Sequence, residues 1–177
     1  MNSTVKKITY SGMFLAIALL LPILTGQIPE IGQALSPMHI PVLLCGFVCG
    51  APYALIVGFI APLLRSTIFH MPQIFPMGLA MAFELAAYGF AAGLLYKALP
   101  KKIPYIYVSL ILSMLIGRVV WGIAMFAISL VAMNVQFGIG AFIAGAFTAA
   151  LPGIILHIVL VPVIVIALKK AKLMGNE

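Results

Sequence analysis

The chain has 177 residues, of which 64% are hydrophobic and only 7% are charged. A typical soluble domain is about 45–50% apolar and about 25% charged, so this composition excludes a water-soluble fold and indicates an integral membrane protein. The length corresponds to a single domain, residues 1–177. The net charge of +7 does not indicate nucleic-acid binding, because the lysines gather at the chain ends and in one loop, which is the pattern of membrane topology.

Six apolar segments, separated by charges, prolines and glycines, are predicted to form helices. The first resembles a signal peptide, but no small-residue cleavage site precedes Gly26, so we expect a retained membrane helix. The second and third are short and meet at Gly50, Ala51 and Pro52, which indicates a tight hairpin with Pro52 in the first turn of the third helix. The other segments approach the length of about 20 residues that crosses a bilayer. The six segments are residues 8–25, 37–50, 52–68, 77–96, 105–132 and 141–168.

The lysines predict how these helices are oriented. With six spans, the lysine-bearing positions all fall on one side, which is therefore the cytoplasmic side and holds both termini. The opposite loops, 26–36, 69–76 and 133–140, contain no lysine or arginine. We therefore predict an all-α bundle of six transmembrane helices in the cytoplasmic membrane. The lysines concerned are Lys6, Lys7, Lys97, Lys101, Lys102, Lys169, Lys170 and Lys172.

The first external loop is long for so small a protein and carries Gln27, Glu30 and Gln33 among apolar residues. Long loops in compact proteins are often functional. Two interpretations stay open here: an ordinary connection, or a lid that folds over an external pocket.

Three charged residues, Glu84, Arg118 and Arg65, lie within apolar segments. A charge at the centre of a membrane helix costs at least about 2.5–3.5 kcal/mol, so such residues usually face the bundle interior and are paired. One interpretation is an internal ion pair that only fixes the packing. The other is a buried polar site in the outer half that binds a solute. Two arginines against one carboxylate leave spare positive charge, which favours an anionic or carboxylate-bearing ligand.

Other polar and aromatic residues are candidates for the same site. Tyr88 lies one helical turn below Glu84, and Trp121 follows Arg118 by three residues, so both are spaced to line one cavity, although each alone is more often ordinary packing. Asn134, at an external helix end, is either solvated or a further candidate. His157 is interpreted as a hydrogen-bonded structural histidine, with a proton relay as the alternative.

Catalytic patterns are absent from the sequence. The chain contains no aspartate, hence no Ser-His-Asp triad, and neither H-E-x-x-H nor G-x-x-x-x-G-K-[ST] occurs. We therefore expect no enzyme, no cofactor and no ATPase activity of its own. An intramembrane enzyme with Glu84 as general acid/base would lack a nucleophile–base pair or a metal motif.

The stretch "SPMHIPVLLCGFVCGA" (36–51) places His39 near Cys45 and Cys49, but it lacks the further ligands of a metal site. The cysteines accompany Gly46 and Gly50 on adjacent helical stripes of small residues, which let membrane helices approach closely. We expect His39 to lie at the external mouth and to touch the ligand. A second small-xxx-small pair, Gly12 and Ala16, lies on the first helix.

Four stretches of the sequence resemble substrate-binding S components of energy-coupling factor (ECF) transporters. They are "MHIPVLLCGFVCG" (38–50), "APYALIVGFIAPLLRS" (51–66), "FPMGLAMAFELAAYGFAAGLLY" (75–96) and "IGRVVWG" (116–122). The resemblance covers nearly the whole chain. It implies a six-helix bundle that captures a vitamin outside the cell, beneath the loop between helices one and two. It also implies docking onto a transmembrane coupling subunit driven by two ATPases, through a first-helix stripe that Gly12 and Ala16 match, with Gly in place of the more usual Ala.

The leading hypothesis is therefore an ECF S component for a micronutrient. Pantothenate fits the spare arginines because it has a carboxylate and several hydrogen-bonding groups, and pyridoxine-like vitamins, queuosine precursors and thiazole precursors are the alternatives. The competing hypothesis is a stand-alone, gradient-driven secondary transporter in which Glu84 and His157 form a proton path.

Overall fold

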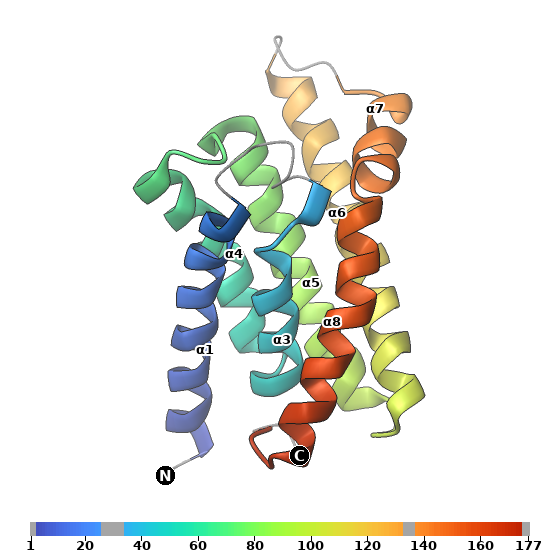
Figure 1. The fold of residues 1–177 in the computed structure, drawn as a ribbon. Helices are drawn as coiled ribbons and strands as arrows, with labels where there is room; N and C mark the ends of the chain where they lie inside the picture. Colours follow the sequence, from blue (N-terminus) through green and yellow to red (C-terminus); the bar gives the residue numbers. More distant parts are fainter. Residues whose placement is uncertain (1–2, 26–33, 133–136, 175–177) are drawn as a thin grey trace.

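A computed structural model describes residues 3–25, 34–132 and 137–174, and within these ranges the chain is helical, with no strand. The helices run roughly along one axis and form a bundle (Figure 1). The long helices are α1 (Ser3–Leu20), α4 (Ala51–Phe69), α5 (Leu79–Ala98), α6 (Ile103–Val131) and α8 (Leu151–Lys170). The shorter elements are η1 (Leu21–Thr25), α3 (His39–Cys49), η2 (Ile74–Gly78), α7 (Ile139–Ile143) and η3 (Ala144–Thr148).

Five of the described helical segments are long and apolar enough to cross a membrane: Ser3–Ile23, Ala51–Phe69, Ile74–Ala98, Ile103–Val131 and Leu151–Lys170. The second predicted segment differs. Its helix, α3, has 11 residues and hence a length of about 16 Å, roughly half the thickness of the hydrocarbon core. The helical membrane architecture is thus confirmed, whereas the number of six crossing helices stays a prediction.

The sixth predicted segment, 141–168, is not one continuous helix. The chain forms α7 and the π-helical turn η3, leaves the helical pattern at residues 149–150, and restarts as α8. Pro152 stands in the first turn of α8, where its missing N–H leaves no hydrogen bond unmade. The break thus coincides with a residue that suits a helix start better than a helix interior.

The predicted hairpin is confirmed at Gly50. This residue has φ 96°, a conformation that favours glycine, and its N–H donates to the Gly46 carbonyl at 3.1 Å. Pro52 lies in the first turn of α4, as predicted. The connection between α3 and α4 is therefore as tight as the sequence indicated.

Glycines bring α3, α4 and α5 into close contact. A Cβ atom added to Gly46 would lie 2.6 Å from the Gly89 carbonyl oxygen, and one added to Gly89 would lie 2.7 Å from the Ala54 carbonyl oxygen. Every residue of α3 is buried, including the free thiols of Cys45 and Cys49. The cysteines are therefore packing residues in the middle of the bundle, as expected from their small size.

The start of α1 and the end of α8 lie at the same end of the bundle (Figure 1). The connection between α5 and α6 reaches this end too, because Lys169 Nζ donates to the Lys101 carbonyl oxygen at 2.8 Å. Lys101 Nζ in turn donates to the Tyr96 carbonyl oxygen at 2.6 Å. Basic residues from two distant parts of the chain are thus gathered at one end.

Candidate functional site

The shortness of α3 decides where His39 lies. The helix ends at the Gly50 turn, toward the end of the bundle that holds the chain termini, and its first residue lies about 16 Å further in (Figure 1). His39 is that first residue, and only 3% of it is exposed. His39 is therefore buried among the helices in the described structure, and its position at an external mouth stays a prediction.

His39 meets the buried charges of α5 and α6. Arg118 Nη1 lies 2.9 Å from Glu84 Oε1, and His39 Nε2 lies 3.5 Å from the same oxygen. Glu84 is 2% exposed and Arg118 is 11% exposed. Neither contact has hydrogen-bond geometry, so Oε1 is held by charge and proximity without a directed donor. The α3 N-terminus carries the positive end of the helix dipole and also favours a carboxylate nearby.

Two further rings complete the cluster. The Tyr88 ring meets the His39 ring edge-on, with centroids 5.1 Å apart. The His157 ring, from α8, stacks on the His39 ring, with centroids 5.9 Å apart and an angle of 26° between the ring planes. A Cβ atom on Gly117 would lie 2.6 Å from the Tyr88 ring, so this glycine provides the space for the ring. We define the site cluster as His39, Glu84, Tyr88, Arg118 and His157.

Sequence reasoning did not place His157 or Gly117 in this site. His157 was expected to be a structural histidine, and its ring does have a backbone neighbour, with Nε2 3.3 Å from the Ser36 carbonyl oxygen. Gly117 is a glycine within an apolar helical segment, "IGRVVWG", and such a glycine can mark a place where a neighbour packs closely.

The site cluster has hydrogen-bonding groups without partners in the described part of the chain. They are Arg118 Nε, both ring nitrogens of His39 and the acceptor Glu84 Oε1. A buried donor that lacks an acceptor costs about 1–3 kcal/mol. A ligand that presents oxygen atoms to Arg118 and His39 would remove this cost, so the site is chemically suited to a ligand with hydrogen-bond acceptors.

A cavity of about 250 Å³ borders the site cluster between α6 and α8. Tyr88 and Arg118 are its polar lining residues, and small-molecule sites commonly combine an apolar wall with a few polar groups. The volume lies just under the usual range of about 300–1,000 Å³, so it accommodates a small ligand or part of a larger one. The apolar lining consists of Ile111, Met114, Leu115, Phe147, Leu151, Ile154 and Ile158.

Arg65 is buried elsewhere in the bundle. Its Nη1 donates to the Leu19 carbonyl oxygen at 2.6 Å, and its guanidinium carbon lies 5.0 Å from the centre of the Phe69 ring. Leu19 is in the last turn of α1, where carbonyl groups have no partner within the helix. Arg65 therefore satisfies the end of α1, and the structure does not bring it to Glu84.

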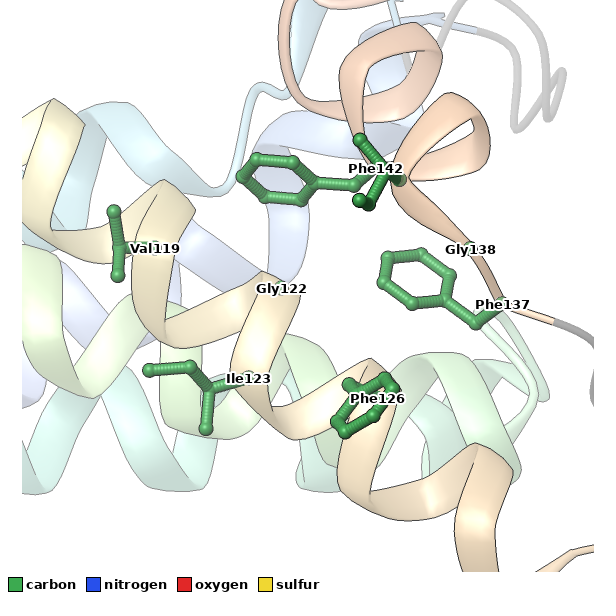
Figure 2. Close-up of a pocket in the computed structure, with 8 residues that line it drawn as sticks. Val119, Gly122, Ile123, Phe126, Phe137, Gly138 and Phe142 are labelled. Atoms are coloured by element: carbon green, nitrogen blue, oxygen red, sulfur yellow. The ribbon is translucent and has the colours of Figure 1, made fainter.

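Trp121 also packs apart from the site cluster. Its ring meets Phe137 edge-on at 5.5 Å and stacks on Phe142 at 6.3 Å. Beside it lies a second cavity of about 430 Å³, bordered by Gly122, Phe126 and Phe137 among other apolar residues (Figure 2). Among the residues that the structure describes, those lining this cavity are all apolar. Asn134, like Gln27, Glu30 and Gln33, lies outside the described residues.

The small-residue pair of α1 lies on the outer surface. Gly12 and Ala16 are exposed, and a Cβ atom on Gly12 would meet no atom of the described residues within 4 Å. The neighbouring Ser11 points inward, where its Oγ donates to the Lys7 carbonyl oxygen at 2.7 Å and lies 3.8 Å from Cys45 Sγ. Within the described chain, α1 therefore turns Ser11 toward α3 and presents Gly12 and Ala16 outward.

Comparison with known protein families gives one match. The family described as "ECF transporter, substrate-specific component" matches residues 6–165. Comparisons with curated proteins and with solved structures find no significant match. Because the family match spans most of the described helices, from α1 into α8, the chain belongs to the substrate-specific S components of ECF transporters.

Proposed function

We propose that this S component binds a micronutrient from outside the cell at the site cluster and delivers it to an ECF coupling subunit powered by two ATPase subunits. Family membership supports the role in transport. The observation that supports the site is the buried Glu84–Arg118 pair beside a cavity, where Arg118 Nε and the His39 ring nitrogens have no hydrogen-bond partner among the described residues.

The proposed ligand presents oxygen acceptors, and a carboxylate-bearing micronutrient such as pantothenate is the preferred example. A carboxylate accepts strong, charge-assisted hydrogen bonds from a guanidinium, and the Nε–H of Arg118 has no acceptor among the described residues. Arg65 adds no spare positive charge to this site, because its guanidinium donates to the Leu19 carbonyl oxygen. A neutral ligand with carbonyl or hydroxyl oxygens is therefore the alternative to be tested beside pantothenate.

The proposed orientation places the lysine-rich end of the bundle in the cytoplasm, by the rule that positive charges stay inside. The site cluster then lies in the bundle interior, at the N-terminal end of the buried helix α3. The proposed docking surface is the exposed face of α1 around Gly12 and Ala16, because small residues allow a partner helix to approach closely in a bilayer.

Uptake in cells that require an external micronutrient tests this function. The chain is expressed alone or with a coupling subunit and its ATPases, and uptake of pantothenate, pyridoxine, and queuosine and thiazole precursors is measured. We expect one of these compounds to be taken up only when the ATPases are present and active. Uptake by the chain alone that collapses with a protonophore would instead support a secondary transporter, with Glu84 and His157 as its proton path.

A further inference from the structure

The residues that lead into α3 lie directly on α8. A Cβ atom on Gly153 would lie 2.6 Å from the Ala34 carbonyl oxygen and 3.0 Å from the Leu35 carbonyl oxygen. These backbone atoms therefore occupy the space that any larger residue at position 153 would need. One helical turn further along α8, His157 Nε2 lies 3.3 Å from the Ser36 carbonyl oxygen. Gly153 and His157 share a helix face and contact three consecutive residues.

The Ser36 carbonyl connects this face of α8 to α3. The same oxygen accepts a hydrogen bond from the His39 backbone N–H at 3.0 Å. A carbonyl only accepts, so the proton between it and the His157 ring is on Nε2. Ser36 itself has φ 46°, in the left-handed region that is uncommon for residues other than glycine. The turn before α3 is thus held in an unusual conformation at the point where α8 contacts it.

We propose that Gly153 and His157 are positioning residues, which hold residues 34–36 against α8 and thereby fix the His39 ring beside Glu84. The His157 ring also stacks on the His39 ring, so α8 contacts the first residue of α3 through both its side chain and its preceding carbonyl. Without these contacts, the start of α3 would keep its packing on α5 but lose its support from α8. The importance of this arrangement for a ligand rests on the proposed function, whereas the contact itself does not.

Amide hydrogen exchange of the purified protein in detergent tests the proposal. In His157→Phe, a ring still stacks on His39 but the donor to Ser36 is lost, whereas His157→Gln retains a donor nitrogen. We expect exchange of the Met38, His39 and Ile40 amides to rise about tenfold in His157→Phe, as expected for the loss of one typical hydrogen bond. In His157→Gln, we expect the exchange rates of these amides to lie within about twofold of the wild-type rates. Val159→Ala, on the exposed side of α8, is the control and should match the wild type.

Gly153→Ala gives an independent test. Alanine ordinarily favours a helix over glycine, but here its methyl group would displace the Ala34 and Leu35 carbonyls. We expect faster exchange at the start of α3 in Gly153→Ala. Exchange there should be unchanged in Gly140→Ala, where an added Cβ would meet no atom of the described residues within 4 Å. This second variant decides the question if His157→Phe does not fold.

Wild-type exchange in both His157→Phe and Gly153→Ala would overturn the proposal. So would equally fast exchange in His157→Phe and His157→Gln, because the donor would then not matter. Failure of the proposed function has a different result: the wild-type protein would retain no small molecule, while the exchange rates would still show whether α8 holds the start of α3.

Discussion

Glu84 Oε1 lies 2.9 Å from Arg118 Nη1 and 3.5 Å from His39 Nε2, so one carboxylate on α5 contacts both α6 and α3. All three groups lie in the bundle interior. Such a pair can hold the packing, bind a ligand, or do both, and variants that remove one or both charges distinguish these roles.

The first prediction concerns stability. Arg118→Met should destabilise the protein by about 3–5 kcal/mol, because it leaves the Glu84 carboxylate buried beside a histidine alone. The double variant Glu84→Gln/Arg118→Met should recover much of this loss, since it buries no uncompensated charge. Thermal unfolding in detergent measures the stability of both variants, and the single variant Glu84→Gln completes the double-mutant cycle. Additive destabilisation in the double variant would show that the two side chains are not coupled.

The second prediction concerns Gly117. Gly117→Ala should destabilise the protein by about 1–3 kcal/mol, because its methyl group would overlap the Tyr88 ring and force it to move. Adding Tyr88→Leu to the same chain should recover part of the loss, since the smaller side chain leaves space. Unfolding of these variants and of the control Gly140→Ala provides the measurement. Gly117→Ala with wild-type stability would mean that the ring moves freely.

Several features of the fold could be predicted from the sequence because they depend on local chemistry. The turn at Gly50, the helix start at Pro52 and the burial of Glu84 follow from glycine, proline and the cost of a charge in lipid. The gathering of lysines at one end of the bundle was predicted from their distribution among the loops. These features need no knowledge of which helices touch.

The remaining features depend on contacts between distant parts of the chain. Arg65 was grouped with Glu84 because both are charged, but its partner is a backbone carbonyl of α1, which no side-chain pattern reveals. Gly153 is required by the backbone at Ala34, more than a hundred residues earlier in the chain. The burial of His39 was not expected, because it depends on the contacts that α3 makes with other helices.

The third prediction separates Arg65 from the ligand site. Arg65→Met should destabilise the protein by about 1.5–3 kcal/mol, because the variant loses a charged donor to the Leu19 carbonyl. The folded fraction should retain the same amount of small molecule as the wild type. Arg65→Met with wild-type stability and no retained molecule would instead return Arg65 to the binding site.

The fourth prediction concerns the exposed face of α1. Gly12→Leu/Ala16→Leu should leave unfolding and ligand retention unchanged, because both positions are exposed on α1 in the described structure. Co-purification with the coupling subunit should be lost, because the bulky side chains prevent close approach of a partner helix. Val159→Leu, an equally apolar change on the exposed side of α8, is the matched control. Normal assembly of the double variant would place the docking surface elsewhere.

The most direct test of the site is mass spectrometry of the small molecules that purified protein retains. The comparison is between the wild type and the double variant Glu84→Gln/Arg118→Met, which should recover much of the stability lost in Arg118→Met. Both proteins are first shown to be folded. We predict that the wild type retains a molecule with oxygen acceptors, such as a carboxylate, and that the double variant retains none. Equal retention by both proteins would contradict the account, because the Glu84–Arg118 pair would then serve packing alone.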